Sequence, residues 1–362
     1  MKRVEARRAV VVCGKTIARD GRLVELVRAA LGDAFGGVYD GVASHSPLDL
    51  VLEATEALRG LQADAVIAVG GGSAVVSARA AVIALAEGSD IQALSTTFRR
   101  GEAPISPRLA KPKLPVFGIP TTPSTAFAKA GTAVLDPQTH RRLTMFDPNT
   151  RCSAVFFHPE FAASAPSSLV LDAALNAFTM CLLGLEAASR EPLADALLLQ
   201  GLRMLLEGLD DFANSPENQK ARGALMIGAL LAGQGTDYTQ SGLALTLGHC
   251  IGLRHHAPGG AVNMLILPHT IRFNASATGE RLRDAIPILG ARADLPVAEA
   301  VARACEDLAD RLGCIRKLSQ LGVSAADFDA VLGDAADDWF LHQNPRKIAD
   351  VEELRPLLDG AL

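Results

Sequence analysis

The 362-residue sequence has few aromatic side chains, no excess of positive charge and no long apolar run. Phe, Trp and Tyr make up only 4% of the residues, which argues against aromatic platforms for stacking bases. The formal net charge of −5 argues against the basic face that nucleic-acid binding needs. Uninterrupted apolar runs fall well short of the ~18 residues that span a bilayer. We therefore expect a protein that binds neither nucleic acid nor a membrane.

The six cysteines are scattered, and none forms a CxxC pair or a Cys/His cluster with zinc spacing. This distribution of cysteines is typical of reduced core thiols in a cytoplasmic protein. The first apolar stretch, residues 9–13, is too short for the core of a signal peptide. We expect a soluble, cytoplasmic protein.

The first part of the chain alternates short β-branched runs with amphipathic stretches. This alternation predicts a parallel sheet covered by helices on both faces. The predicted strands are 9–13, 37–39, 65–69 and 115–119, the predicted helices are 23–31, 48–61 and 74–86, and 94–113 is a predicted loop.

The character of the sequence changes after about residue 160. Long Leu- and Ala-rich segments with a 3.6-residue period predict helices. These segments are 168–189, 193–214, 220–233, 241–253, 297–312 and 325–337. We predict two domains, an α/β domain over residues 1–160 and an all-α domain over 161–362. Ligands in such architectures usually lie between the domains, beyond the carboxyl ends of the strands.

The strongest local signal is a strand that runs into Gly70, Gly71 and Gly72, followed by a helix that Ser73 opens. Glycines let backbone N–H groups approach an anion, and the helix N-terminus adds partial positive charge. The turn lacks the GxGxxG pattern, and a tight turn without a ligand is the alternative. We interpret it as a phosphate cradle for a nucleotide cofactor.

Other polar groups follow the neighbouring predicted strands. Thr121 and Thr122 can donate to a phosphate or carboxamide, and Thr125 lies in the same segment. Asp40 can accept from ribose hydroxyls, although a turn aspartate before Gly41 explains it equally well. A carboxylate at this position would favour NAD over NADP.

A second group of candidates lies in the helical half. His249 falls on an apolar helical segment, where a satisfied core histidine is the commoner case. The adjacent Arg254, His255 and His256 favour a functional role, because they can polarise a carbonyl or hold an anion.

The motifs occur in a characteristic order, and the series covers nearly the whole chain. It consists of Tyr39-Asp40-Gly41-Val42, Gly70-Gly71-Gly72-Ser73, Pro120-Thr121-Thr122, Asp147-Pro148, Asn176-Ala177-Phe178-Thr179-Met180, His249-Cys250-Ile251-Gly252 and Leu267-Pro268-His269. This series resembles the iron-containing alcohol dehydrogenase superfamily, which has the dehydroquinate-synthase-like fold. The resemblance implies a Rossmann-like N-terminal domain, a helical C-terminal domain, a homodimer, and a cofactor on the glycine turn.

Within that superfamily the chain is most similar to the maleylacetate reductase branch. The His45-Ser46-Pro47 turn, Val76 and the Asn344-Pro345-Arg346 segment carry this likeness. Metal-dependent members bind a divalent ion through one Asp and three His. The resemblance places other residues at those positions, namely Asn176, Met180, Leu245 and Gly259.

These replacements argue against a catalytic metal. Leu and Gly offer no ligand, Met is soft, and Asn is neutral, so a hard dication would lack charge balance. Counting from Pro166, as the family does, gives Asn176 rather than Asp172 as the first ligand position. A replacement site built from the histidines at 249, 255 and 256 is an alternative.

The substrate half also departs from the maleylacetate reductase branch, at Ala244, Leu245, Gly259 and Asn263. The first hypothesis is therefore a metal-independent NAD(P)H-linked reductase of a small carbonyl substrate, an oxo acid or an aldehyde. His249 and Asn176 are its candidate catalytic residues, and the basic residues after His249, together with Asn263, are its candidate substrate ligands. Two alternatives are a nucleotide-binding protein whose catalysis is lost, and a lyase of the dehydroquinate-synthase type.

Overall fold

The computed structural model describes residues 1–98, 104–139, 141–239 and 241–362, and it divides into two compact units. Unit 1 is Met1–Ala165 and unit 2 is Pro166–Leu362. The border predicted after residue 160 falls within the short helix α6 (Pro159–Ser164), which belongs to unit 1.

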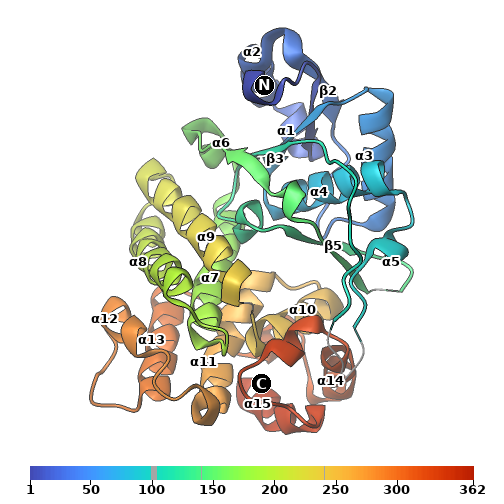
Figure 1. Cartoon of the computed structure of the whole chain (residues 1–362). Helices are drawn as coiled ribbons and strands as arrows, with labels where there is room; N and C mark the ends of the chain where they lie inside the picture. Colours follow the sequence, from blue (N-terminus) through green and yellow to red (C-terminus); the bar gives the residue numbers. More distant parts are fainter. Residues whose placement is uncertain (99–103, 140, 240) are drawn as a thin grey trace. The chain divides into compact units, whose positions relative to one another are not determined.

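Unit 1 is built on a five-stranded sheet in the order β2-β1-β3-β4-β7, and every pair of neighbours is parallel. It occupies the blue-to-green part of the chain in Figure 1. The strands are β1 (Ala9–Cys13), β2 (Phe35–Tyr39), β3 (Ala65–Gly70), β4 (Val116–Pro120) and β7 (Cys152–Val155). From β1 the chain adds β2 on one side and β3 on the other, and ligands of α/β proteins bind where the strand order reverses in this way.

Helices cover both faces of this sheet, as the alternating pattern predicts. The helices are α1 (Lys15–Arg19), α2 (Gly21–Leu31), α3 (Leu48–Gly60), α4 (Gly72–Glu87), α5 (Ile91–Leu94) and α6. One core cluster joins Val11 and Ile67 of the sheet to Leu23 of α2 and Phe161 of α6. Helix α4 packs on the sheet and against α3. The strands are consequently buried on both sides, as apolar runs of β-branched residues require.

Three strands of unit 1 were not predicted. They are β7 and the antiparallel pair β5 (Gly131–Leu135) and β6 (Arg142–Phe146), which form a separate two-stranded sheet. The buried side chain of Arg79 on α4 organises this region. Its guanidinium donates to the carbonyl oxygens of Thr150, Gly131 and Ala126 at 3.1, 2.7 and 3.0 Å. Because buried carbonyls need donors, this one side chain orders three separate segments.

Residues 99–103 of the predicted 94–113 loop lie outside the described residues. The described part contains a single bridge between Thr97 and Ile105, and α5 ends at Leu94.

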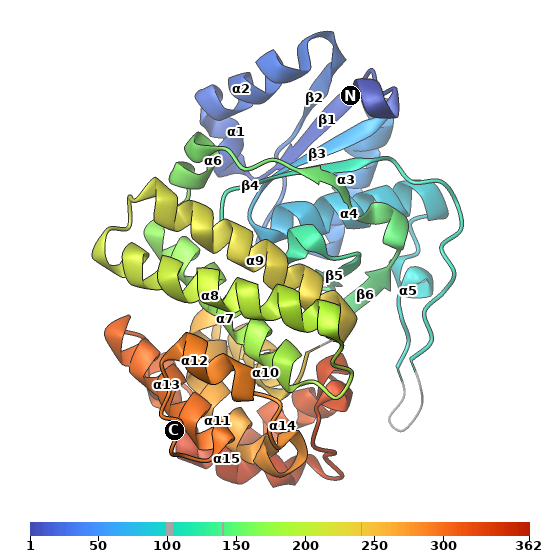
Figure 2. The ribbon, with the colours of Figure 1, turned by 60° about the vertical axis from the view of Figure 1, so that its left-hand side comes forward.

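Unit 2 is helical, and α8 and α9 lie side by side along their lengths (Figure 2). Its helices are α7 (Ser167–Glu186), α8 (Pro192–Asn214), α9 (Gln219–Thr239), α10 (Leu243–His255), α11 (Gly259–Thr278), α12 (Ile286–Leu289), α13 (Val297–Arg311), α14 (Phe328–Ala336) and α15 (Arg355–Ala361). By length and composition alone α7 would suffice to cross a membrane, but 67% of its apolar window is buried inside the structure. It is a central helix that packs against α8, α9 and α11.

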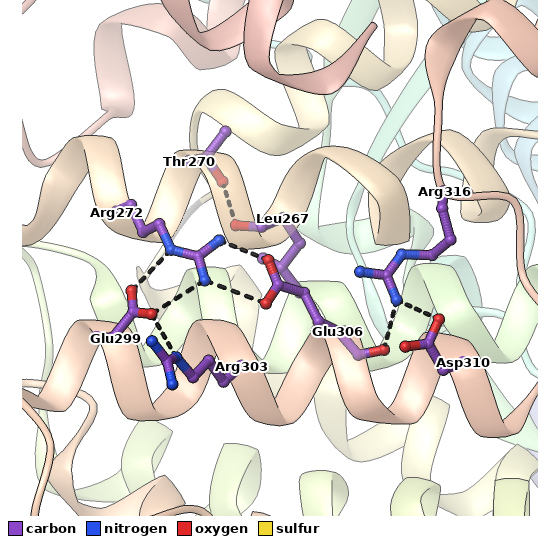
Figure 3. Close-up of polar contacts among 8 residues, drawn as sticks. All are labelled: Leu267, Thr270, Arg272, Glu299, Arg303, Glu306, Asp310 and Arg316. Carbon is purple, nitrogen blue, oxygen red and sulfur yellow. Dashed lines mark hydrogen bonds and ion pairs between the residues drawn. The ribbon is translucent and has the colours of Figure 1, made fainter.

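Helix α11 is the longest element that the sequence analysis omitted. It begins at Gly259-Gly260 and contains Pro268, which are all unfavourable in helices. Tertiary contacts override these local preferences. In Figure 3 the guanidinium of Arg272 on α11 binds both Glu299 and Glu306 on α13, at 2.8 and 2.6 Å. Glu299 also accepts from Arg303 of its own helix at 2.6 Å.

Candidate functional site

The glycine turn of unit 1 joins the end of β3 to the start of α4. Gly70 has φ +142°, a conformation that L side chains rarely adopt. Gly70 is also paired with Pro120 at the end of β4, and the N–H of Thr121 donates to the Gly70 carbonyl at 2.9 Å. The turn and the Thr121–Thr122 segment therefore lie at the same edge of the sheet.

At the next two glycines, hydroxyl groups lie so close to the backbone that a side chain would collide with them. A Cβ on Gly71 would lie 2.9 Å from the hydroxyl oxygen of Thr122, and one on Gly72 would lie 2.8 Å from that of Ser124. Helix α4 begins at Gly72 and no side chain caps it. Its first backbone N–H groups and these hydroxyls form a cradle that fits a phosphate.

The other predicted cofactor residues have different environments. Thr121, Thr122 and Thr125 are buried, and Thr125 opens a short turn that Arg79 holds in place. Asp40 is exposed directly after β2. It lies near Cys13 at the end of β1, where burial first and the negative charge of Asp40 second raise the pKa of the thiol to about 12. The structure pairs none of the six cysteines in a disulfide, and Cys152 and Cys314 are only half-buried.

A strained loop supports the glycine turn, and the sequence did not reveal its role. His45 and Ser46 have φ values of +62° and +51°, which costs about 1–3 kcal/mol for each residue. The Ser46 hydroxyl donates to the carbonyl of Ser73 at 3.2 Å, and the Ser46 carbonyl accepts from the N–H of Leu135 at 3.1 Å. The His45-Ser46 pair thus joins the first turn of α4 to β5.

In unit 2, His249 of α10 lies against Asp338. Its Nδ1 is 3.1 Å from Asp338 Oδ2, and its ring packs on Phe340 with centroids 5.4 Å apart. Asp338 Oδ1 accepts from the hydroxyl of Thr246 at 3.2 Å and from the N–H of Phe340 at 2.9 Å. The carboxylate is therefore held by two donors and faces one nitrogen of the imidazole. Sequence reasoning missed Asp338, because it is 89 residues away and no spacing links it to His249.

Two other predicted residues are bonded to each other. The Nδ2 of Asn263 on α11 donates to the Oδ1 of Asn176 on α7 at 2.8 Å. Asn263 is 2% exposed, so it does not lie open to a substrate. Its Oδ1 is buried without a hydrogen-bond partner in the described structure, and a Cβ on Gly248 would lie only 1.7 Å from that oxygen.

The predicted basic residues lie at the end of α10, where Arg254 and His255 are in its last turn and His256 follows it. Arg254 is exposed and binds Asp334 of α14 at 2.6 Å. His256 is exposed and ends α10 with φ +51°. His255 has its Nε2 buried without a hydrogen-bond partner among the described residues. A substrate-binding role for the three remains a prediction.

The residues at the expected ligand positions do not suit a hard or borderline dication. Met180 Sδ accepts from the Ser241 hydroxyl at 3.6 Å, Leu245 is apolar, Gly259 has no side chain, and Asn176 already accepts from an amide. This donor set has neither imidazole nor carboxylate, so it offers no negative charge to a cation.

Asp172, one turn before Asn176, has a structural role. Its Oδ1 accepts from the N–H of Ala261 at 2.9 Å at the start of α11, and burial raises its pKa. In the described ranges of the chain, groups of three or more His, Cys, Asp or Glu that could hold a metal are absent.

Comparison with known proteins identifies related families for both units. A family model described as iron-containing alcohol dehydrogenase matches residues 1–159, and one for the C-terminal part of the Fe-containing alcohol dehydrogenase family matches residues 170–361. The lactaldehyde reductase of Escherichia coli (strain K12) is 28% identical, over 98% of this chain and 92% of that protein. Maleylacetate reductase 2 of Cupriavidus pinatubonensis (strain JMP 134 / LMG 1197) is 31% identical, over 80% of this chain and 72% of that protein.

Solved structures share the fold. A 1,3-propanediol oxidoreductase superposes with a TM-score of 0.90 at 21% identity, over 100% of this chain and 94% of that one. The sulfoacetaldehyde reductase of Bifidobacterium kashiwanohense in complex with NAD+ gives 0.85 at 18% identity, over 99% of this chain and 92% of that one. These matches confirm the predicted fold class, a Rossmann-like α/β unit followed by a helical unit.

Proposed function

The chain belongs to the iron-containing alcohol dehydrogenase family, and on that premise we propose that it is an NAD(P)H-linked, metal-independent reductase of a small carbonyl compound. It is an oxidoreductase of the alcohol dehydrogenase type, like its relatives. The observation that carries the finer proposal is the contrast between the two units. Unit 1 has a glycine turn at an uncapped helix N-terminus, with hydroxyl groups packed against it, whereas the ligand positions of unit 2 lack every charged or imidazole donor.

Unit 1 holds the cofactor in this proposal. The backbone at Gly71, Gly72 and Ser73 binds the pyrophosphate, and the hydroxyls of Thr121 and Thr122 donate to the cofactor. Asp40 accepts from the ribose hydroxyls and repels a ribose phosphate, so NADH is preferred to NADPH. When bound, the cofactor supplies a hydride to the carbonyl carbon of the substrate.

His249 supplies the proton. As the C=O bond is reduced, its electron pair moves to the oxygen, which takes a proton from the imidazolium and becomes a hydroxyl. In this proposal Asp338 accepts the Nδ1–H of the ring, and Nε2 carries the proton that is transferred. The same carboxylate stabilises the protonated ring, as carboxylates do beside catalytic histidines.

The substrate class follows from the missing Lewis acid. A metal ion contributes several kcal/mol by polarising a carbonyl, so a reductase without one suits an activated substrate. An aldehyde or an oxo acid such as maleylacetate has that reactivity, and two relatives are reductases of lactaldehyde and of maleylacetate. We further propose a cytoplasmic homodimer.

A second candidate is a nucleotide-binding protein that has lost catalysis. The buried apolar residues Met180 and Leu245 at ligand positions favour it, since they offer a substrate neither charge nor a hydrogen bond.

One assay separates the two candidates. NADH oxidation is followed at 340 nm with a panel of aldehydes and oxo acids, in the presence of EDTA and after addition of Fe2+ or Zn2+. We expect turnover with at least one carbonyl compound, unchanged by chelator or metal. Binding of NADH without turnover across the panel supports the second candidate. Activity that EDTA abolishes and metal restores contradicts metal independence.

A further inference from the structure

We propose that the Asn176 side chain donates a hydrogen bond to the substrate's carbonyl oxygen, and that Asn263 and Gly248 fix the orientation of its amide. This inference rests on the proposed reductase function. It assigns the site an oxyanion-binding group, and it makes Asn263 a positioning residue.

The first step is the contact between α7 and α11. Asn263 donates its Nδ2 to the Oδ1 of Asn176 at 2.8 Å, from a position that is 2% exposed. Asn176 itself is only half-buried. A buried side chain thus holds the oxygen of a partly exposed one, which restricts the Asn176 amide to a single orientation.

The second step is the orientation of Asn263, which Gly248 determines. The Oδ1 of Asn263 occupies the space of the missing Cβ of Gly248. An amide oxygen against the Cα–H groups of a glycine makes a weak favourable contact, whereas an NH2 group there would bury two unsatisfied donors. Asn263 therefore presents Nδ2, and not Oδ1, to Asn176.

The third step concerns the NH2 group of Asn176. The Oδ1 of Asn176 is already bonded, so Nδ2 is the atom left to donate. This nitrogen is not one of the fully buried polar atoms without a hydrogen-bond partner. In the described chain it has no hydrogen-bond partner and is not fully buried, so it is available as a donor. The bond accepted at Oδ1 also polarises the amide, which strengthens the N–H groups as donors.

The charge of this side chain suits the reaction. Reduction of a carbonyl builds negative charge on oxygen, which a carboxylate would repel and an amide N–H stabilises. Asn176 binds the oxygen while the charge develops, and His249 protonates it. The Asn176–Asn263 pair thus supplies, by hydrogen bonding, charge stabilisation of the kind a metal ion provides.

The test begins with Asn176→Asp, which keeps the shape and the bond accepted from Asn263 but removes the donor. We expect kcat to fall about 100-fold or more, as for loss of one oxyanion donor, with an unchanged dissociation constant for NADH. The measurement is carried out in EDTA. Wild-type turnover together with an Asn176→Asp kcat within threefold of it overturns the inference and leaves the reductase function standing. Failure of the wild type on every carbonyl compound overturns the function itself.

A second pair of variants tests the positioning role without touching Asn176. In Gly248→Ala the new methyl group displaces the Asn263 amide, and we expect kcat to fall about tenfold with little change in KM. Gly252→Ala is the matched control on the same helix, because its Cβ would meet only the Ala257 carbonyl at 3.4 Å.

Asn263→Ala should lower kcat to a similar extent. Adding Gly248→Ala to it should then have no further effect, because both substitutions act through one side chain. Additive losses, or a similar loss in Gly252→Ala, would show a general packing effect and contradict the positioning role.

Discussion

At the scale of single residues, the environment of a titratable group decides what it can do. Asp338 illustrates this, because two donors fix its carboxylate before it meets His249. Its place beside the imidazole follows from packing between α10 and the C-terminal segment. Local sequence patterns cannot predict such a long-range contact. The glycine turn was predictable because its strand, turn and helix are consecutive in the sequence.

The first prediction concerns Asp338→Asn. We expect kcat to fall about 10- to 100-fold, because an amide cannot stabilise the imidazolium of His249. Steady-state kinetics measure the effect, and a kcat within threefold of wild type would contradict this role of Asp338. Asp334→Asn, which removes the exposed partner of Arg254, is the control and should leave kcat unchanged.

Glu186 leads to a prediction about stability. It ends α7 and is 1% exposed, and burial raises its pKa to about 8 although Asn274 donates to its Oε2 at 3.2 Å. Between the ordinary glutamate pKa and about pH 8, the folded protein holds a proton that the unfolded chain has released. The free energy of unfolding therefore falls as pH rises through this window.

Glu186→Gln should remove that dependence. Relative to wild type, the variant should gain stability on going from pH 5.5 to pH 8, with a limiting slope of about 1.4 kcal/mol per pH unit. Urea denaturation at four pH values measures the effect. A constant difference between the two proteins across the range would be inconsistent with a protonated Glu186.

At the scale of elements, periodicity predicted helices well where apolar residues repeat without interruption, as in α8. It failed for α11, since Pro268 and the initial glycines resemble a loop, and for β5 and β6, which are short and only half-buried. Contacts such as those of Arg272 with α13 stabilise α11 in place of local propensity.

The packing of α8 on α9 gives the third prediction. A Cβ on Gly228 would lie 2.8 Å from Leu205 Cγ and 3.2 Å from the Gly201 carbonyl, so the two backbones are in close contact. We expect Gly228→Ala to destabilise the protein by about 1–3 kcal/mol through overpacking. Gly223→Ala, on the same helix with open space around it, should be neutral or stabilise by up to about 1 kcal/mol. Thermal or urea unfolding of the pair checks this, and equal effects would refute the close contact.

At the scale of the whole molecule, the order of motifs predicted the fold and the family, because the motifs are distributed over both units, from Asp40 to His269. The substitutions at ligand positions were also visible in the sequence. The side-chain contacts of this region were not, because they join residues far apart along the chain. Asn263 of α11 binds Asn176 of α7, and His249 of α10 contacts Asp338 in the segment after α14.

The fourth prediction is that the folded protein does not depend on a divalent metal. Purified protein should contain iron, zinc and nickel well below one equivalent by elemental analysis, and its melting temperature should not change in EDTA. The reason is that Met180, Leu245 and Gly259 provide neither charge nor hard ligands. One equivalent of metal, with a lower melting temperature after its removal, would refute this.

The His45-Ser46 pair has a consequence for the proposed binding of a cofactor. Both residues are already in their strained left-handed conformations, and Ser46 is already bonded to Ser73 at the start of α4. The conformational entropy of this loop has therefore been lost during folding, before any ligand arrives. In the proposed function, a cofactor at the glycine turn would meet a loop that is already ordered, and the strain held in His45 and Ser46 would serve as pre-organisation.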